Sequence, residues 1–207
     1  MFSGKEVIWI IIAILIGGFV IGLSSKLEPS LIGLLWASII ILVSVIAKKI
    51  AAPFYSLKIE HKSWGWKRWG WYERSQFKKP IPLGIILPFF LSVLSLAIIK
   101  PLTLLQFDAE NFTKKRVLRK RGTYRYSEIN ESDLAFTAAW GFWALIALAI
   151  LCSFLKQPEI SRYAIYYGIW NLIPFGNLDG TKIFFGSLTN WILLVIVYII
   201  SLVIVLI

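Results

Sequence analysis

The sequence predicts an all-α, polytopic membrane protein that forms a single membrane domain over residues 1–207. Apolar residues make up 58% of the chain and charged residues only 16%, against roughly 25% charged residues in soluble domains. The mean hydropathy is +0.74. The apolar residues gather in long runs, so we expect the lipid bilayer to surround most of the chain.

Six apolar segments are candidates for membrane helices, because a spanning helix needs roughly 20 apolar residues. The first is long for a signal peptide and no small-residue cleavage site follows it, so we expect an uncleaved helix. The fifth is short and runs into a turn with Pro174, which predicts a broken helix there. The segments cover residues 7–23, 31–47, 81–99, 134–155, 163–175 and 188–207.

The basic residues decide how the third segment crosses the membrane. Nine of the 22 Lys and Arg residues lie between Lys48 and Lys79, and eight lie between Lys100 and Arg125. If 81–99 spans, the basic residues divide 12 inside to 10 outside; if it returns, they divide 19 to 3. Because basic loops stay cytoplasmic, we predict a re-entrant or interfacial segment in a cytoplasmic-type membrane. The N-terminus and the basic loops 48–80 and 100–133 are then cytoplasmic.

Four tryptophans follow the second segment and alternate with basic residues. Aromatic rings with cationic neighbours are typical of the headgroup layer, so we interpret this stretch as an interfacial anchor. A stacking surface for single-stranded nucleic acid uses similar residues, but the adjacent membrane segment favours the anchor, and no nucleic-acid partner is expected. The four residues are Trp64, Trp66, Trp69 and Trp71.

Gly18 and Gly22 form a GxxxG pattern in the first segment. Small residues at this spacing let two helix backbones approach closely. The pattern predicts close helix packing, either within the chain or between two copies.

The stretch NLIPFGNLDG fits the pattern N-x-x-P-x-x-x-x-D-G through Asn171, Pro174, Asp179 and Gly180. It resembles the second signature of the site-2 protease family, intramembrane zinc metalloproteases that cut transmembrane substrates. The resemblance implies a site-2-protease-like helical core with a break at this turn. It also implies that Asp179 occupies the position of a zinc ligand near the cytoplasmic face.

The family carries an HExxH motif on an earlier helix, and the best counterpart here is SVIAKKIAA. In this overlay Ser44 and Lys48 replace the two histidines, and Val45 replaces the glutamate. The family's GPxxN-like stretch has its counterpart in AFTAAWGFW, where Ala138 and Ala139 replace glycine and proline. The resemblance therefore extends to the fold and not to the catalytic residues.

The donor atoms for a zinc site are also missing from the composition. The chain contains one histidine, His61, and one cysteine, whereas a zinc protease needs about three protein ligands. Glu60 and His61 are adjacent, so they do not form an i, i+4 ligand pair. We interpret His61 as an ordinary loop residue and predict no metal, no cofactor and no catalytic residue.

Two interpretations of Lys48 and Asp179 remain open at this stage. Ser44 and Lys48 are four positions apart and share a helix face. In the family arrangement this face would be directed at Asp179. The Lys48 ammonium would then replace the metal and offset the charge of Asp179. Alternatively, Lys48 extends to the interface beside Lys49 while Asp179 caps the following turn.

The sequence favours an inactive site-2 protease homologue that binds or scaffolds transmembrane protein clients or belongs to a membrane complex. Asn171 and its turn would line the client groove, as the resemblance implies. The alternative is an active intramembrane protease with a non-standard site. That site would be either a metal at Asp179 with ligands from His61 or a partner chain, or a Ser44 and Lys48 dyad. A transporter would show inverted repeats, and the sequence shows none.

Overall fold

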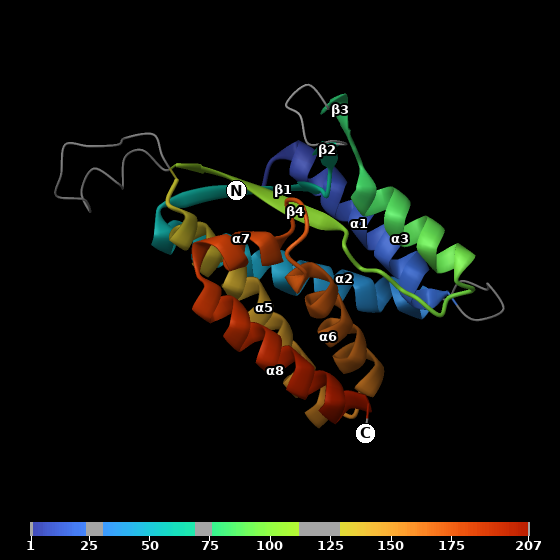
Figure 1. Cartoon of the computed structure of the whole chain (residues 1–207). Coiled ribbons are helices and arrows are strands. Elements are labelled where there is room, and N and C mark those ends of the chain that lie inside the picture. The colour runs from blue at the N-terminus through green and yellow to red at the C-terminus, as the bar shows by residue number, and fades with distance from the viewer. Residues whose placement is uncertain (1, 24–30, 69–75, 112–128, 207) are drawn as a thin grey trace, which may run out of the picture.

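The computed structural model describes residues 2–23, 31–68, 76–111 and 129–206. Within these ranges the chain is mostly helical and carries two small antiparallel sheets (Figure 1). The elements are α1 (Gly4–Gly22), α2 (Leu31–Ala51), the 3-10 helix η1 (Ala52–Tyr55), β1 (Leu57–Ser63), β2 (Trp66–Arg68), β3 (Gln76–Ile81), α3 (Leu83–Leu94), β4 (Leu105–Asn111), α5 (Glu131–Phe154), α6 (Pro158–Leu172), α7 (Asp179–Gly186) and α8 (Leu188–Leu206).

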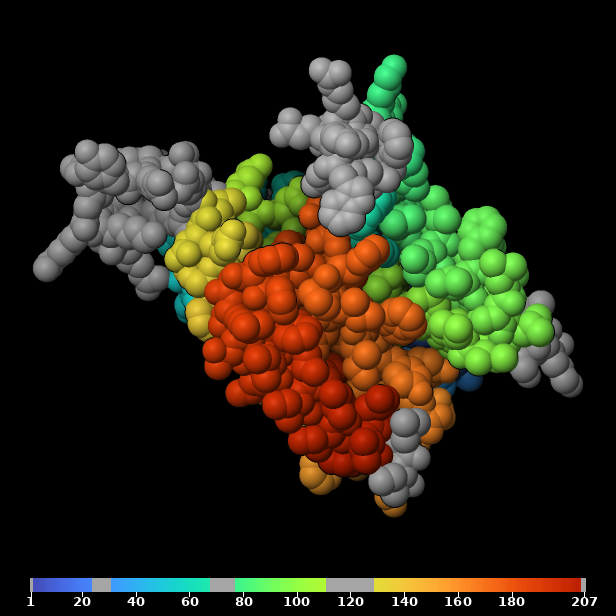
Figure 2. All heavy atoms as spheres, viewed as in Figure 1, coloured from blue at the N-terminus to red at the C-terminus, as the bar shows by residue number. Residues whose placement is uncertain are grey.

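Four helical segments are long and apolar enough to cross a membrane, so the protein is an integral membrane protein in contact with the lipid bilayer. These segments are Gly4–Gly22, Leu31–Tyr55, Glu131–Phe154 and Leu188–Val205. Only 11% of the apolar stretch of α8 is buried within the protein. Figure 2 shows α8 covering much of one face of the molecule.

The helices form two groups that meet at α2. Helix α1 packs on α2 and on α3, α2 continues onto α5, and α5 packs on α6 and α7, with α8 against α6 (Figure 1). The GxxxG glycines of α1 serve the α1–α2 contact. A Cβ added at Gly18 would lie 2.7 Å from Leu34 Cα, and one at Gly33 would lie 2.5 Å from Gly22 Cα. This pattern is therefore used within the chain.

The predicted helix break at the NLIPFGNLDG turn is confirmed. Helix α6 ends at Leu172, two residues before Pro174, and α7 begins at Asp179. The two helices remain in close contact, because a Cβ at Gly180 would lie 2.2 Å from the Leu172 carbonyl oxygen. The same carbonyl accepts a hydrogen bond from Trp191 Nε1 at 3.0 Å.

The prediction of an all-α chain is too strict, because the described residues include four strands, which lie in the regions expected as basic loops except that β3 ends one residue beyond, at Ile81. Strand β1 pairs antiparallel with β4, and β2 pairs with β3. The sequence LKIEHKS alternates as a strand requires, with Leu57, Ile59 and His61 on the buried face. Its charged residues occupy the other face, and the basic composition hid this alternation.

The segment 81–99 contains no candidate span. Its helix α3 covers only 12 residues, about half of what a crossing needs. The chain reverses after α3 through Leu96 and Ala97, both with positive φ. Strand β4 then returns beside β1, so Leu57 and Asn111 lie opposite each other. This path brings the described residues on both sides of α3 together in one sheet, and the side of the membrane on which the basic regions lie stays a prediction.

Candidate functional site

Lys48 and Asp179 form a buried ion pair at the centre of the candidate site. The Lys48 ammonium lies 2.5 Å from Asp179 Oδ2, and the two side chains are 4% and 3% exposed. Lys48 comes from the last turns of α2, and Asp179 is the first residue of α7. The predicted pair is confirmed, and the alternative in which Lys48 extends to the interface is wrong.

A glycine on α5 makes room for the Lys48 side chain. A Cβ at Gly141 would lie 2.6 Å from Lys48 Cε and 3.0 Å from its Cγ. Even alanine at this position would displace the lysine. Gly141 therefore determines the path by which the ammonium reaches Asp179.

A second lysine, Lys182, approaches the other oxygen of Asp179 from the next turn of α7. Its ammonium lies 3.7 Å from Asp179 Oδ1 and donates a hydrogen bond to the Phe107 carbonyl of β4. The same ammonium lies 3.4 Å from the centroid of the Phe107 ring, and that of Lys48 lies 5.9 Å from it. The sequence analysis missed Lys182, although its i, i+3 spacing from Asp179 was a visible signal.

The two lysines keep Asp179 ionised. Burial raises the pKa of this carboxyl, but the charges of Lys48 and Lys182 outweigh burial, so the pKa is lowered overall. Burial lowers the pKa of Lys182 to about 8, although Asp179 opposes this shift. The site is therefore a carboxylate held between two cations.

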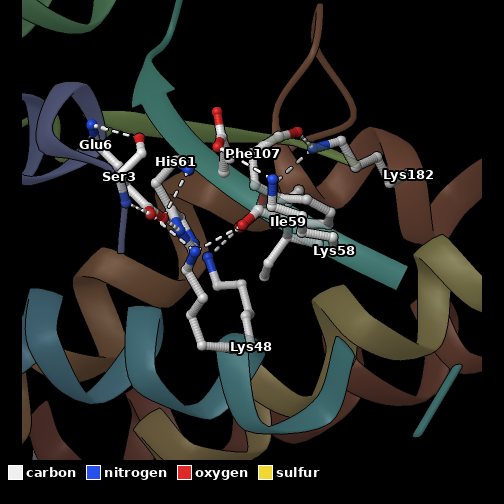
Figure 3. A network of polar contacts seen from close by, with 11 residues as sticks. Ser3, Glu6, Lys48, Lys58, Ile59, His61, Phe107 and Lys182 are labelled. Atoms are coloured by element: carbon white, nitrogen blue, oxygen red, sulfur yellow. Dashed lines mark hydrogen bonds and ion pairs between the residues drawn. The ribbon is translucent and has the colours of Figure 1, made fainter. Parts of the chain in front are cut away.

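A second polar cluster surrounds Glu6 in the first turn of α1, where α1 meets His61 of β1 (Figure 3). Glu6 Oε1 accepts hydrogen bonds from the His61 backbone N–H at 2.9 Å and faces His61 Nδ1 at 2.8 Å. Glu6 Oε2 lies 2.8 Å from the Lys49 ammonium, which also donates to the Ile59 carbonyl. Glu6 and Ser3 form the capping box that starts α1.

His61 is not a loop residue, as the sequence suggested, but a buried strand residue that is 1% exposed. Burial lowers its pKa to about 4, with the Glu6 hydrogen bond opposing and the Lys48 charge reinforcing the shift. The ring is neutral near pH 7, so Nδ1–H donates to Glu6. His61 connects the two clusters, since its ring lies 6.1 Å from that of Phe107, its partner in β4.

The donor groups of this site do not fit zinc. Asp179 is bound to two ammonium groups, His61 is held by Glu6, and the HExxH counterpart offers Ser44, Val45 and Lys48. Within the described ranges, no three His, Cys, Asp or Glu side chains lie close enough to hold one metal ion.

The Ser44 and Lys48 side chains have different partners. Lys48 is directed at Asp179, whereas the buried Ser44 hydroxyl interacts with the Tyr167 phenol of α6. A lysine base must hydrogen-bond the serine that it activates, whereas the Lys48 ammonium is bonded to Asp179. The geometry therefore does not favour a Ser44 and Lys48 dyad.

Asn171, the first residue of the motif, is 3% exposed and faces the interior. Its Nδ2 donates to the Leu102 carbonyl at 3.0 Å and to the Tyr167 carbonyl at 2.7 Å. Its Oδ1 is buried without a hydrogen-bond partner among the described residues. The expected client-lining asparagine thus contacts the chain's own backbone.

Of the four tryptophans predicted as an interfacial anchor, the structure describes Trp64 and Trp66. Trp64 is only 2% exposed and packs edge-on against Phe175 of the motif turn at 6.0 Å. Trp66 stacks on the same ring at 4.9 Å. The interfacial role predicted for Trp64 is wrong, because its indole fills the space over the turn. Trp69 and Trp71 lie outside the described residues.

The sequence matches no protein-family model, and comparisons with curated proteins and with solved structures give no match. The four motif positions and the geometry around them are therefore the grounds for any assignment of function.

Proposed function

We propose that this protein is a catalytically inactive homologue of the site-2 proteases that binds or scaffolds transmembrane protein clients. The observation that carries the proposal is the buried Lys48–Asp179 ion pair. It occurs where the motif would place a zinc ligand opposite the helix that would carry HExxH. An ammonium balances the carboxylate charge as a metal does, but it cannot activate a water molecule for hydrolysis.

The ion pair gives Asp179 a structural role that is independent of catalysis. Lys48 belongs to α2 and Asp179 to α7, so the pair joins the two groups of helices. Removing Asp179 would leave the buried Lys48 ammonium without a carboxylate, and removing Lys48 would leave Asp179 with Lys182 alone. The pair therefore explains how this chain keeps the aspartate of the motif without the remaining zinc ligands.

The motif turn keeps an exposed apolar surface that supports client binding. Ile173 is 42% exposed and Phe175 is 48% exposed, although the neighbouring Asn171, Leu172 and Leu178 are buried. The Trp66 ring stacks on the Phe175 ring. We propose that a transmembrane client contacts Ile173 and Phe175 at this turn.

The proposal is tested with the full chain in liposomes and a synthetic single-span peptide that carries a photoreactive leucine. The expected result is crosslinking to the protein without cleavage of the peptide. Phe175→Ala should reduce crosslinking several-fold, whereas Phe154→Ala, at the exposed end of α5, should not. Cleavage that is lost in Asp179→Ala would contradict the proposal and favour the active protease.

A further inference from the structure

A cavity of about 210 Å³ lies between the first turn of α5 and helix α7, beside the motif turn. Glu131 and Leu134 line it from α5, and Thr181, Lys182 and Phe185 line it from α7. Glu131 and Phe185 are exposed, so the cavity lies at the surface of the protein. It therefore combines polar groups of both charges with apolar walls.

The cavity lies at the depth where two candidate membrane spans begin. Glu131 is the first residue of one span, and α7 ends two residues before Leu188, the first residue of the other. Helix α7 packs on both α5 and α8 (Figure 1). A Cβ at Gly186 would lie 2.2 Å from the Glu131 carbonyl oxygen, so the two starting points are in contact. Because the ends of spanning helices lie in the headgroup layer, lipid headgroups are the molecules next to this cavity.

Two residues that line the cavity have hydrogen-bond donors to spare. Thr181 Oγ1 is buried and has no hydrogen-bond partner among the described residues. The Lys182 ammonium donates to the Phe107 carbonyl and faces Asp179, which leaves at least one of its three N–H groups for another acceptor. The Lys182 side chain is 17% exposed. A phosphate group has several acceptor oxygens and would satisfy both donors.

The charges around the cavity favour a ligand with a negative and a positive end. Lys48 and Lys182 share one carboxylate, that of Asp179, and Lys48 is the closer of the two. The charge of Lys182 is therefore only partly balanced, and a negative group beside it is favoured. Glu131, at the exposed side of the cavity, favours a positive group there.

We propose that this cavity binds the phosphoethanolamine headgroup of an aminophospholipid. Its phosphate binds Thr181 and Lys182, and its ammonium binds Glu131. Phe185 is 70% exposed and Leu188 is 50% exposed, so both offer apolar surface to the acyl chains. A choline headgroup has no N–H for Glu131, and a glycerol headgroup has no positive charge. The inference needs only contact with the bilayer and is independent of client binding.

The first experiment offers the protein a choice of headgroups. The detergent-purified full chain is incubated with equal amounts of phosphatidylethanolamine, phosphatidylcholine and phosphatidylglycerol that carry the same acyl chains. Native mass spectrometry then measures which lipids stay bound. We expect one phosphatidylethanolamine per chain, retained several-fold over each of the other two lipids. Equal retention of the three lipids, or a preference for either of the other two, would overturn the proposal.

Two variants test the residues. Thr181→Val removes the hydroxyl at nearly constant side-chain volume and breaks no hydrogen bond among the described residues. It should leave the melting temperature unchanged and reduce retention of phosphatidylethanolamine several-fold. Thr189→Val is the matched control, because Thr189 is exposed in the first turn of α8, and it should retain the lipid fully. Glu131→Gln, an exposed position, should remove the preference for phosphatidylethanolamine over phosphatidylglycerol.

The remaining outcomes concern the place and the nature of the ligand. Full retention of phosphatidylethanolamine in both Thr181→Val and Glu131→Gln would mean that the lipid binds elsewhere and would overturn the proposal. Soluble phosphoethanolamine, added at the concentration of the lipid, should not displace it, because the acyl chains contribute to binding. Displacement at that concentration would identify a soluble ligand and overturn the assignment of a lipid.

Discussion

Lys48 and Asp179 are 131 positions apart in the sequence, and their side chains form a 2.5 Å ion pair in the protein interior. The pair lies between two helices that otherwise meet through α5, so its charge balance and its packing are both open to experiment. The buried His61 and the paired strands β1 and β4 provide two further tests.

Replacing one partner of this pair should destabilise the protein more than replacing both. Asp179→Asn leaves the buried Lys48 ammonium without a carboxylate, and Lys48→Met leaves Asp179 with the more distant Lys182 alone, at a cost of up to about 3–5 kcal/mol. The double variant should recover about 1–3 kcal/mol relative to additivity, measured as free energies of unfolding in detergent. The exposed pair Lys62 and Asp108 is the control, with an expected coupling of about 0.2–1 kcal/mol. Strict additivity at Lys48 and Asp179 would show that the contact has no energetic role.

Gly141→Ala should destabilise the protein through Lys48. The added Cβ would lie within 3.0 Å of two side-chain carbons of the lysine, and overpacking of this kind costs about 1–3 kcal/mol. Gly4→Ala is the matched control, because nothing lies within 4 Å of its Cβ position. Shortening the lysine in the same chain, as in Gly141→Ala with Lys48→Ala, should remove most of the steric part. An equal loss in both glycine variants would argue against the proposed role of Gly141.

His61 should make stability depend on pH. Its pKa is about 4 in the folded protein and 6.5 in the reference state, so the unfolded chain binds the extra proton first. Stability is then complete above about pH 6.5 and falls by about 3 kcal/mol as the pH approaches 4. Glu6, Lys49, Lys48 and Asp179 are the charged groups around this ring.

His61→Gln keeps an amide donor for Glu6 but does not titrate, so it isolates this pH dependence. Because His61 is the only histidine, the difference between the two unfolding curves between pH 4 and 6.5 reports this group. Parallel curves for the original chain and the variant would contradict the burial of a neutral His61.

Because β1 and β4 are paired, cysteines placed on these two strands should react from the same side of the membrane. Glu60→Cys and Glu110→Cys replace side chains that are 46% and 74% exposed on the paired strands β1 and β4. In a Cys152→Ala background, both should react with an impermeant maleimide from the same side of sealed vesicles. Lys156→Cys, beyond the α5 span, should react from the other side. Labelling of Glu60→Cys and Glu110→Cys from opposite sides would mean that the intervening segment spans.

The sequence was most informative about the long helices, because an apolar run of spanning length has few alternative structures in a membrane. It placed the start of α2 at Leu31 and that of α8 at Leu188, as observed. It began α1 too late, at residue 7, because the Ser3 and Glu6 capping box adds a polar first turn. The strands were missed because they contain many charged residues, which are also typical of loops.

The candidate site could be predicted only where a motif or a helix period specified it. The i, i+4 spacing of Ser44 and Lys48, together with the motif aspartate, was enough to propose the ion pair. The contributions of Gly141, Phe107 and the Leu102 carbonyl depend on elements that meet only in the folded chain. Trp64 was misinterpreted for the same reason, because its burial depends on Phe175, more than a hundred positions away.

In our proposal Lys48 takes the place of a metal at Asp179, so the zinc content of the detergent-purified protein is the decisive measurement. We expect no stoichiometric zinc in the original chain, and the same result for Asp179→Ala. About one zinc per chain, lost in Asp179→Ala, would rule out this replacement and indicate a metalloprotease with an unusual ligand set.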